Sequence, residues 1–131
     1  MRSSDITASV AHRWVEAWTS GDRDRVDAIL GDRVTIEHNL GLPVERVVLL
    51  DTIQALATAL GEAEVLSLTA TDSRAALLYD CHVRQPAGGP GDIRLAEFLD
   101  LDGERIAGIR RIYDLTAVDR LLPGLHGPAA A

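Results

Sequence analysis

The amino-acid sequence predicts an α+β fold in which a curved, cone-shaped antiparallel sheet wraps around three helices from the first half of the chain. Two patterns lead to this prediction. Apolar residues recur every three or four positions in most of the first 60 residues, whereas from Val65 onward they alternate with polar residues, as in strands. A chain of 131 residues can bury one core, so we expect one domain over residues 1–131, with its core at 5–122 and a mobile tail at 123–131.

Four segments have the spacing of apolar residues that is typical of a helix packed on a core. They span residues 4–20, 23–30, 47–60 and, as a brief turn, 116–122. We expect Ser4 and Asp5 to cap the first helix and Asp22 to cap the second, because short polar side chains accept hydrogen bonds from the free N–H groups at a helix start. Glycines at positions 21, 31 and 61 predict where the first three helices end.

Five segments have the alternating pattern of strands with one buried face. They span residues 34–39, 65–71, 74–84, 92–101 and 105–114. The sequence Gly41-Leu42-Pro43 breaks the first strand. Asp102-Gly103 joins the last two strands, because Asp-Gly is a strong signal for a tight hairpin. This order of elements gathers the helices on one face of the sheet and leaves room for a cavity.

The composition excludes several classes of function. All 13 basic residues are arginine, so the chain holds no lysine for a Schiff base or a phosphate-binding loop. The formal charge of −7 opposes binding to nucleic acid or to an anionic membrane surface, so we expect neither partner. Cys81 is the single cysteine, and the first 22 residues lack the continuous apolar stretch of a signal peptide. These features predict a cytoplasmic protein.

Glu97 lies in an unexpected place within the predicted strand 92–101. It shares one face of that strand with four apolar residues, Ile93, Leu95, Leu99 and Leu101. A carboxylate in such a row is costly unless it is protonated or paired with a cation. Two interpretations follow: Glu97 is a functional group in a pocket, or it is satisfied by an arginine or turned outward by a bulge.

Several stretches of the chain resemble a known superfamily. The first helix contains Trp14-Val-Glu-Ala-Trp-Thr-Ser-Gly-Asp22, the first strand contains Val34-Thr-Ile-Glu-His-Asn39, and the last hairpin leads from Asp102-Gly-Glu-Arg-Ile106 to Arg111-Ile-Tyr-Asp-Leu115. Together with the order of elements, they resemble the nuclear-transport-factor-2-like superfamily, in its SnoaL-like and ketosteroid-isomerase-like branch, over roughly residues 5–122. The resemblance implies a cystatin-like α+β barrel with a pocket inside its cone.

The resemblance to ketosteroid isomerase implies roles for three residues. It places His38 where that enzyme has its proton-shuttling aspartate, Trp14 at its oxyanion tyrosine, and Glu97 at its protonated oxyanion aspartate. His38 also follows two apolar residues on the buried face of its predicted strand, and a histidine can accept and return a proton near neutral pH. Ordinary core packing by Trp14 and a structural role for His38 stay open.

The faces of the last strand, 105–114, are both mixed in polarity. The resemblance places Ile109, Arg111 and Tyr113 toward the pocket, where Arg111 would meet Glu97 on the neighbouring strand. An outward, solvated Arg111 is the alternative.

The strand 74–84 offers two sets of inward residues. Counting from the Asp72-Ser73 turn favours Tyr79 and Cys81, whereas the resemblance to limonene epoxide hydrolase matches Asp80 to a catalytic aspartate and would turn Asp80 and His82 inward. That enzyme's arginine two positions before the aspartate corresponds to Leu78, and its second aspartate corresponds to Arg111. The residues that open an epoxide are therefore incomplete in this chain.

The resemblance, together with these residues, thus implies a cofactor-independent enzyme of the SnoaL-like kind that performs acid–base chemistry, as a cyclase, isomerase or dehydratase, on an apolar carbonyl-bearing metabolite such as a polyketide or terpenoid. His38 is the expected base, and Glu97 with Arg111 or Trp14 would assist the developing oxyanion. The substrate pocket is expected to include Trp14, Tyr79, Cys81, Ile109, Tyr113 and, in the second register, Asp80. No metal site is expected, because the histidines and acidic residues lack the spacing of metal ligands.

The alternative prediction is a non-catalytic ligand-binding or dimerisation module, because one fold hosts many functions. The resemblance also implies a homodimer through the outer face of the sheet, with Phe98 and Ala96 exposed as apolar surface.

Overall fold

The computed structural model describes residues 2–39, 41–84 and 91–123 of the chain. Its helices are α1 (Ser3–Thr19), α2 (Arg23–Ile29), α3 (Arg46–Ala55) and α4 (Leu115–Leu121). Its strands are β1 (Leu30–His38), β2 (Leu42–Pro43), β3 (Leu60–Ala70), β4 (Arg74–Val83), β5 (Asp92–Asp102) and β6 (Arg105–Tyr113). Apart from residue 123, the predicted tail lies outside the described residues.

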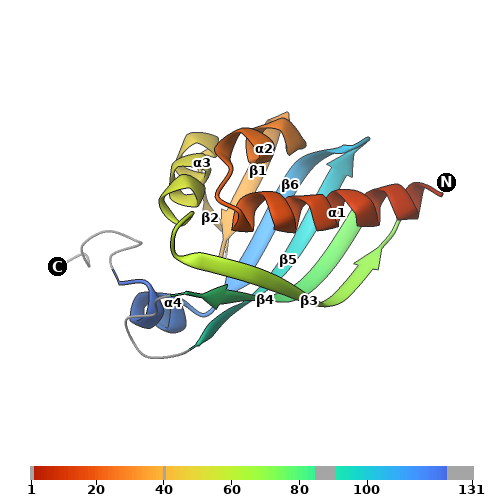
Figure 1. Ribbon diagram of the computed structural model, residues 1–131. Helices are drawn as coiled ribbons and strands as arrows, with labels where there is room; N and C mark the ends of the chain where they lie inside the picture. Colours follow the sequence, from red (N-terminus) through yellow and green to blue (C-terminus); the bar gives the residue numbers. More distant parts are fainter. Residues whose placement is uncertain (1, 40, 85–90, 124–131) are drawn as a thin grey trace.

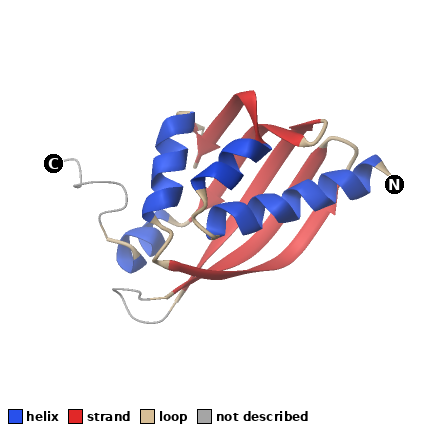
Figure 2. Cartoon of the chain, turned by 45° about the horizontal axis from the view of Figure 1, so that its top comes forward, coloured by secondary structure: helices blue, strands red, loops and turns tan. Residues whose placement is uncertain are grey.

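The six strands form one curved sheet in the order β2-β1-β6-β5-β4-β3 (Figure 1). The sheet is open, because its two edge strands, β2 and β3, do not pair with each other. Helices α1, α2 and α3 lie on the same face of the sheet, with α1 across its strands (Figure 2). The predicted α+β class and curved sheet are confirmed.

One strand pair differs from the predicted antiparallel arrangement. β1 and β6 run parallel, so the sheet is mixed, while all its other neighbouring pairs are antiparallel. Parallel neighbours require a long crossover, and here the connection is everything between β1 and β6. The hydrophobic pattern fixes which face of β1 is buried, but it does not fix the strand direction.

The inner face of the sheet follows the predicted alternation. Every second residue of β4 and β5 is buried, including Cys81, Leu95 and Glu97. In β6 the register shifts between Asp100 and Leu101 on the partner strand, so that Ile106 is buried as well as the inward residues further along. This irregularity explains why neither face of β6 is uniformly apolar in the sequence.

The ends of several elements depart from the predictions. The N-cap of α1 is Arg2, which makes no side-chain capping bond, rather than Ser4 or Asp5; Asp22 does cap α2, because its side chain accepts a hydrogen bond from the Arg25 N–H. α3 ends at Ala55 and not near Gly61, because β3 already begins at Leu60 by pairing with the end of β4. The two-residue strand β2 was not predicted.

The predicted hairpin between β5 and β6 is confirmed. Asp102 pairs with Arg105, and Gly103 has a φ of +63°. Such a left-handed backbone favours glycine, which has no Cβ to clash with the chain.

Candidate functional site

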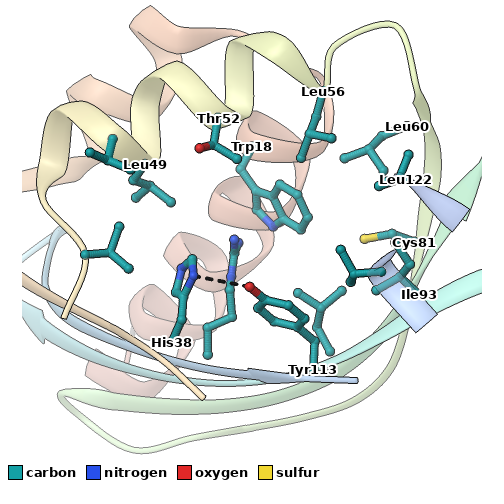
Figure 3. Close-up of a pocket in the computed structure, with 15 residues that line it drawn as sticks. Trp18, His38, Leu49, Thr52, Leu56, Leu60, Cys81, Ile93, Tyr113 and Leu122 are labelled. Atoms are coloured by element: carbon teal, nitrogen blue, oxygen red, sulfur yellow. Dashed lines mark hydrogen bonds between the residues drawn. The ribbon is translucent and has the colours of Figure 1, made fainter. Parts of the chain in front are cut away.

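A cavity of about 330 Å³ lies between α3 and the inner face of the sheet, with α4 at one end (Figure 3). Its wall is mostly apolar and includes Trp18 from α1, Leu49 from α3 and Leu95 from β5. Five residues bring polar groups to the wall: His38, Thr52, Cys81, Arg111 and Tyr113. An apolar chamber of this size with a few polar groups is typical of small-molecule sites, which measure about 300–1,000 Å³.

Glu97 lies behind this wall and is fully buried. Its Oε2 accepts a hydrogen bond from Nε of Arg111 at 2.7 Å, and its Oε1 accepts from Nε1 of Trp14 at 3.0 Å and from the Tyr79 hydroxyl. Glu97 and Arg111 are direct cross-strand neighbours on β5 and β6. We call these four residues the Glu97 cluster. Of the two interpretations of Glu97, the structure thus shows pairing with an arginine.

Arg111 connects the Glu97 cluster to the cavity. Its side chain is only 7% exposed, and Cζ of its guanidinium lies 4.3 Å from the centre of the Trp18 ring system. Burial is the largest single effect and acts to lower the pKa of Arg111. The charge of Glu97, its hydrogen bond and the neighbouring Tyr79 and Cys81 together more than offset burial, so the pKa lies above its ordinary value. Among the described residues, Nη2 is buried and has no hydrogen-bond partner. The arrangement therefore leaves a buried cationic donor at a cavity wall.

His38 and Tyr113 lie beside Arg111 and point toward one another (Figure 3). Nδ1 of His38 is 3.5 Å from the Tyr113 hydroxyl, and the two rings meet edge to face with centroids 5.7 Å apart. Burial raises the pKa of Tyr113, while the charge of Arg111 acts in the opposite direction, so the phenol stays protonated near neutral pH.

Asn39 fixes the end of β1 against β6. Its backbone N–H donates to the Arg111 carbonyl at 2.9 Å, and its side-chain oxygen accepts from the Tyr113 N–H at 2.9 Å. Its φ of +30° is a conformation that asparagine adopts more readily than most residues. These contacts hold His38, at the end of β1, next to Arg111 and Tyr113.

The two registers predicted for β4 are resolved in favour of Tyr79 and Cys81. Both are buried, and Cys81 reaches the cavity wall. Burial raises the pKa of the Cys81 thiol to about 12, so the nucleophilic thiolate is scarce at neutral pH. The prediction of Asp80 in the pocket is wrong, because Asp80 lies on the outer face and accepts hydrogen bonds from Arg94 at 2.8 and 3.0 Å.

Three further residues that we expected around the substrate lie behind the cavity wall. Trp14 and Tyr79 point their donors at Glu97, and Ile109 packs in the core, paired with Leu99 across the sheet. Their predicted place on the wall is therefore corrected to a supporting place. Glu97, predicted to touch the substrate, reaches the cavity only through Arg111.

Trp18 and Thr52 also line the wall, although neither was predicted there. Trp18 lies four residues after Trp14, which places both on one face of α1 and was the available signal. Besides stacking on Arg111, Trp18 donates from Nε1 to the Tyr79 hydroxyl at 2.8 Å.

None of the helices in the described ranges is long and apolar enough to cross a membrane. Within the same ranges, no group of three or more His, Cys, Asp or Glu residues is arranged to hold a metal ion.

Comparison with known proteins identifies the family. The sequence model of the SnoaL-like domain family matches residues 11–109, which is more than half of the chain. No curated protein sequence matches the chain.

Three solved structures illustrate the fold. PrhC from Penicillium brasilianum NBRC 6234 has a TM-score of 0.76 at 14% identity and covers 91% of this chain and 87% of that protein. An LEH-like epoxide hydrolase from M. tuberculosis has a TM-score of 0.71 at 17% identity, with 94% of each chain covered. A protein with a cystatin-like fold from Silicibacter pomeroyi DSS-3 has a TM-score of 0.68 at 16% identity and covers 89% of this chain and 82% of that protein. These TM-scores show a shared fold, and the family match shows that the chain belongs to the SnoaL-like domain family.

Proposed function

We propose that this protein is a cofactor-independent enzyme that performs acid–base chemistry on an apolar carbonyl-bearing metabolite, such as a polyketide or terpenoid. The observation that carries the proposal is that one apolar cavity is lined by both the His38 imidazole and the buried Arg111 guanidinium, one nitrogen of which has no partner among the described residues. A site with an unpartnered donor and a base in reach of the same ligand is equipped for proton transfer next to a carbonyl group.

The proposed reaction begins at the carbon next to the carbonyl. His38 removes a proton from that carbon, the C–H electron pair moves into the carbonyl group, and the oxygen becomes an enolate that accepts a hydrogen bond from Arg111. Returning the proton to another carbon gives isomerisation, attack of the enolate on a second carbonyl gives cyclisation, and loss of a neighbouring hydroxyl as water gives dehydration. A general base contributes about 10²–10⁴-fold and one oxyanion donor about 10²–10³-fold to such a rate.

Glu97 has a positioning role in this proposal. Its carboxylate holds Arg111 by one nitrogen, Nε, and so orients the rest of the guanidinium toward the cavity. The other Glu97 oxygen is occupied by Trp14 and Tyr79, so Glu97 itself does not donate to the substrate.

The second candidate is a protein that binds a small molecule and releases it unchanged. The observation that favours it is the engagement of Glu97 in three hydrogen bonds within the protein, because the predicted catalytic carboxyl group is then not itself available for proton transfer.

Exchange of α-protons for deuterium separates the two candidates without knowledge of the natural substrate. The protein is incubated with 2-tetralone, a compact apolar ketone, in D₂O, and deuterium uptake is followed by NMR. We expect exchange above the uncatalysed rate, and a loss of about 10²-fold or more in His38→Ala. The matched control is His82→Ala, because His82 is an exposed histidine that contacts Asp92 away from the cavity.

Two outcomes bear on the candidates, and a third tests the assay itself. Wild-type exchange in His38→Ala contradicts the role of the base. Saturable binding of the ketone without any exchange favours the second candidate. Loss of exchange in His82→Ala as well would show that the assay reports a general property of the protein and not the site.

A homodimer through the outer face of the sheet also belongs to this proposal. Phe98 and Ile112 are about half exposed there, on neighbouring strands, and large exposed apolar side chains on a sheet favour association. We expect light scattering to give twice the monomer mass and Phe98→Asp to give the monomer mass. A monomeric wild-type protein would contradict this part of the proposal.

A further inference from the structure

Few charges face the cavity. Arg111 is the one wall residue of permanent charge in the described part of the chain, and no Asp or Glu lies on the wall. The other titratable wall residues are His38, Cys81 and Tyr113, and the last two are held in their neutral forms. Asp119, whose charge acts on Tyr113, is exposed on α4.

The charge of Arg111 is already balanced from behind. Its Nε is 2.7 Å from Glu97 Oε2, and both side chains are buried, at 7% and 0% exposure. Nη2, in contrast, has no hydrogen-bond partner among the described residues. Arg111 lies on the cavity wall and uses only Nε to bind Glu97, so its guanidinium retains N–H donors that no described residue accepts, but no unbalanced positive charge.

This separation of donor and charge discriminates between ligands. A neutral carbonyl oxygen accepts the N–H hydrogen bond and adds no charge to the buried cluster. A carboxylate accepts the same hydrogen bond, but it is repelled by Glu97 across the guanidinium and loses its hydration on entry. Its attraction to Arg111 is thus largely offset.

We infer that Glu97 makes the cavity selective for neutral ligands that present one acceptor oxygen to Arg111, such as a ketone, an ester or an enol, over carboxylates of the same shape. This inference deepens the proposed function and rests on it in one respect, namely that the cavity is the ligand site. It does not depend on whether His38 acts as a base.

The test compares two ligands of nearly the same shape, 2-acetylnaphthalene and 2-naphthoate. Their dissociation constants are measured by calorimetry at about pH 8, where an ordinary histidine is neutral. The proteins are the wild type, Glu97→Gln and Glu104→Gln. Glutamine retains the shape of Glu97 and removes its charge. Glu104→Gln makes the same change of net charge at an exposed site that pairs weakly with Arg13, and serves as the matched control.

We expect the wild type and the control to bind the ketone at least about tenfold more tightly than the carboxylate. In Glu97→Gln the positive charge of Arg111 is no longer balanced, so carboxylate affinity should rise by about tenfold or more while ketone affinity changes by less than about threefold. If the role of Glu97 were purely structural, Glu97→Gln would instead weaken the binding of both ligands to the same extent. Circular dichroism checks that the variant is folded.

Three results would overturn the inference. They are equal or tighter binding of the carboxylate by the wild type, an unchanged ratio of affinities in folded Glu97→Gln, and absence of binding of both ligands up to about 1 mM. Should Glu97→Gln not fold, the wild-type ratio decides. Preferential binding of the ketone without α-proton exchange would overturn the proposed chemistry and support the selectivity, so the two failures are distinguishable.

Discussion

The ion pair between Glu97 and Arg111 predicts strongly non-additive effects on stability. Replacing Glu97 with leucine leaves the buried guanidinium without a counter-charge and removes the acceptor of the Trp14 and Tyr79 donors. Breaking a buried pair from one side costs about 3–5 kcal/mol, and a buried donor without a partner adds about 1–3 kcal/mol. The sum approaches the whole stability of a small domain, about 5–15 kcal/mol.

Arg111→Met removes the other member of the ion pair and leaves Glu97 without its cation. Glu97 then retains its two neutral donors but loses the cation that it pairs with, and we expect a loss of about 3–5 kcal/mol. In the double variant Glu97→Leu/Arg111→Met no uncompensated charge remains, so its free energy of unfolding should exceed the additive expectation by about 3 kcal/mol. The methionine side chain also retains contact with the Trp18 ring system, which limits the packing loss.

Urea denaturation followed by circular dichroism measures these free energies. If a variant has no folded baseline, the wild type, the two single variants and the double variant are all measured in an osmolyte such as sucrose, which stabilises the four proteins alike. Additivity of the two single changes within about 0.5 kcal/mol would refute the reasoning, because residues that share a buried ion pair cannot act independently. A neutral effect of Glu97→Leu would refute it as well.

Two further predictions concern single groups. The Cys81 thiol has a pKa of about 12, whereas an ordinary cysteine has a pKa of about 8.5, so at about pH 8 it should react with a disulfide reagent on the order of 10³-fold more slowly. Full labelling should require denaturation. Rapid stoichiometric labelling of the native protein would contradict this prediction. The hydrogen bond from Arg94 lowers the pKa of Asp80 in the folded state, so this contact stabilises the protein at neutral pH, and the stabilisation is lost as the pH falls through that lowered pKa. The variant Asp80→Asn should therefore be most destabilised, relative to the wild type, at neutral pH. A difference in melting temperature between the two proteins that grows toward acid pH would contradict this prediction.

The sequence was informative where one periodicity governs a whole element. Strict alternation in β5 identified Glu97 as a carboxylate in an apolar row, and the structure places it there, fully buried. β6 could not be treated in the same way, because a register shift opposite Asp100 changes which residues face inward, and no residue pattern in the strand announces it. The resemblance to a family was needed to place Arg111 inward.

Which residues reach the cavity depends on the curvature of the sheet, and the periodicity of the sequence carries no information about that curvature. Trp14 and Trp18 share one face of α1 and both pack over the sheet, but only Trp18 reaches the cavity. The sheet bends beneath the helix, so two side chains one turn apart meet different surroundings. Predicting that difference from sequence would require the sheet geometry in advance.

The proposed reaction has a pH dependence that follows from the shifted groups around Arg111. The pKa of each of Arg111, Tyr113 and Cys81 lies above its ordinary value, so none of them changes charge between about pH 5 and pH 9. His38 is the remaining titratable wall residue in the described chain, and a base must be neutral to accept a proton. The rate of α-proton exchange, corrected for the uncatalysed reaction, should thus rise with pH through one ionisation and then stay level up to about pH 9. A second ionisation that lowers the rate within this range would show that a protonated group other than Arg111 supplies the donor, and would contradict the assignment of the donor to Arg111.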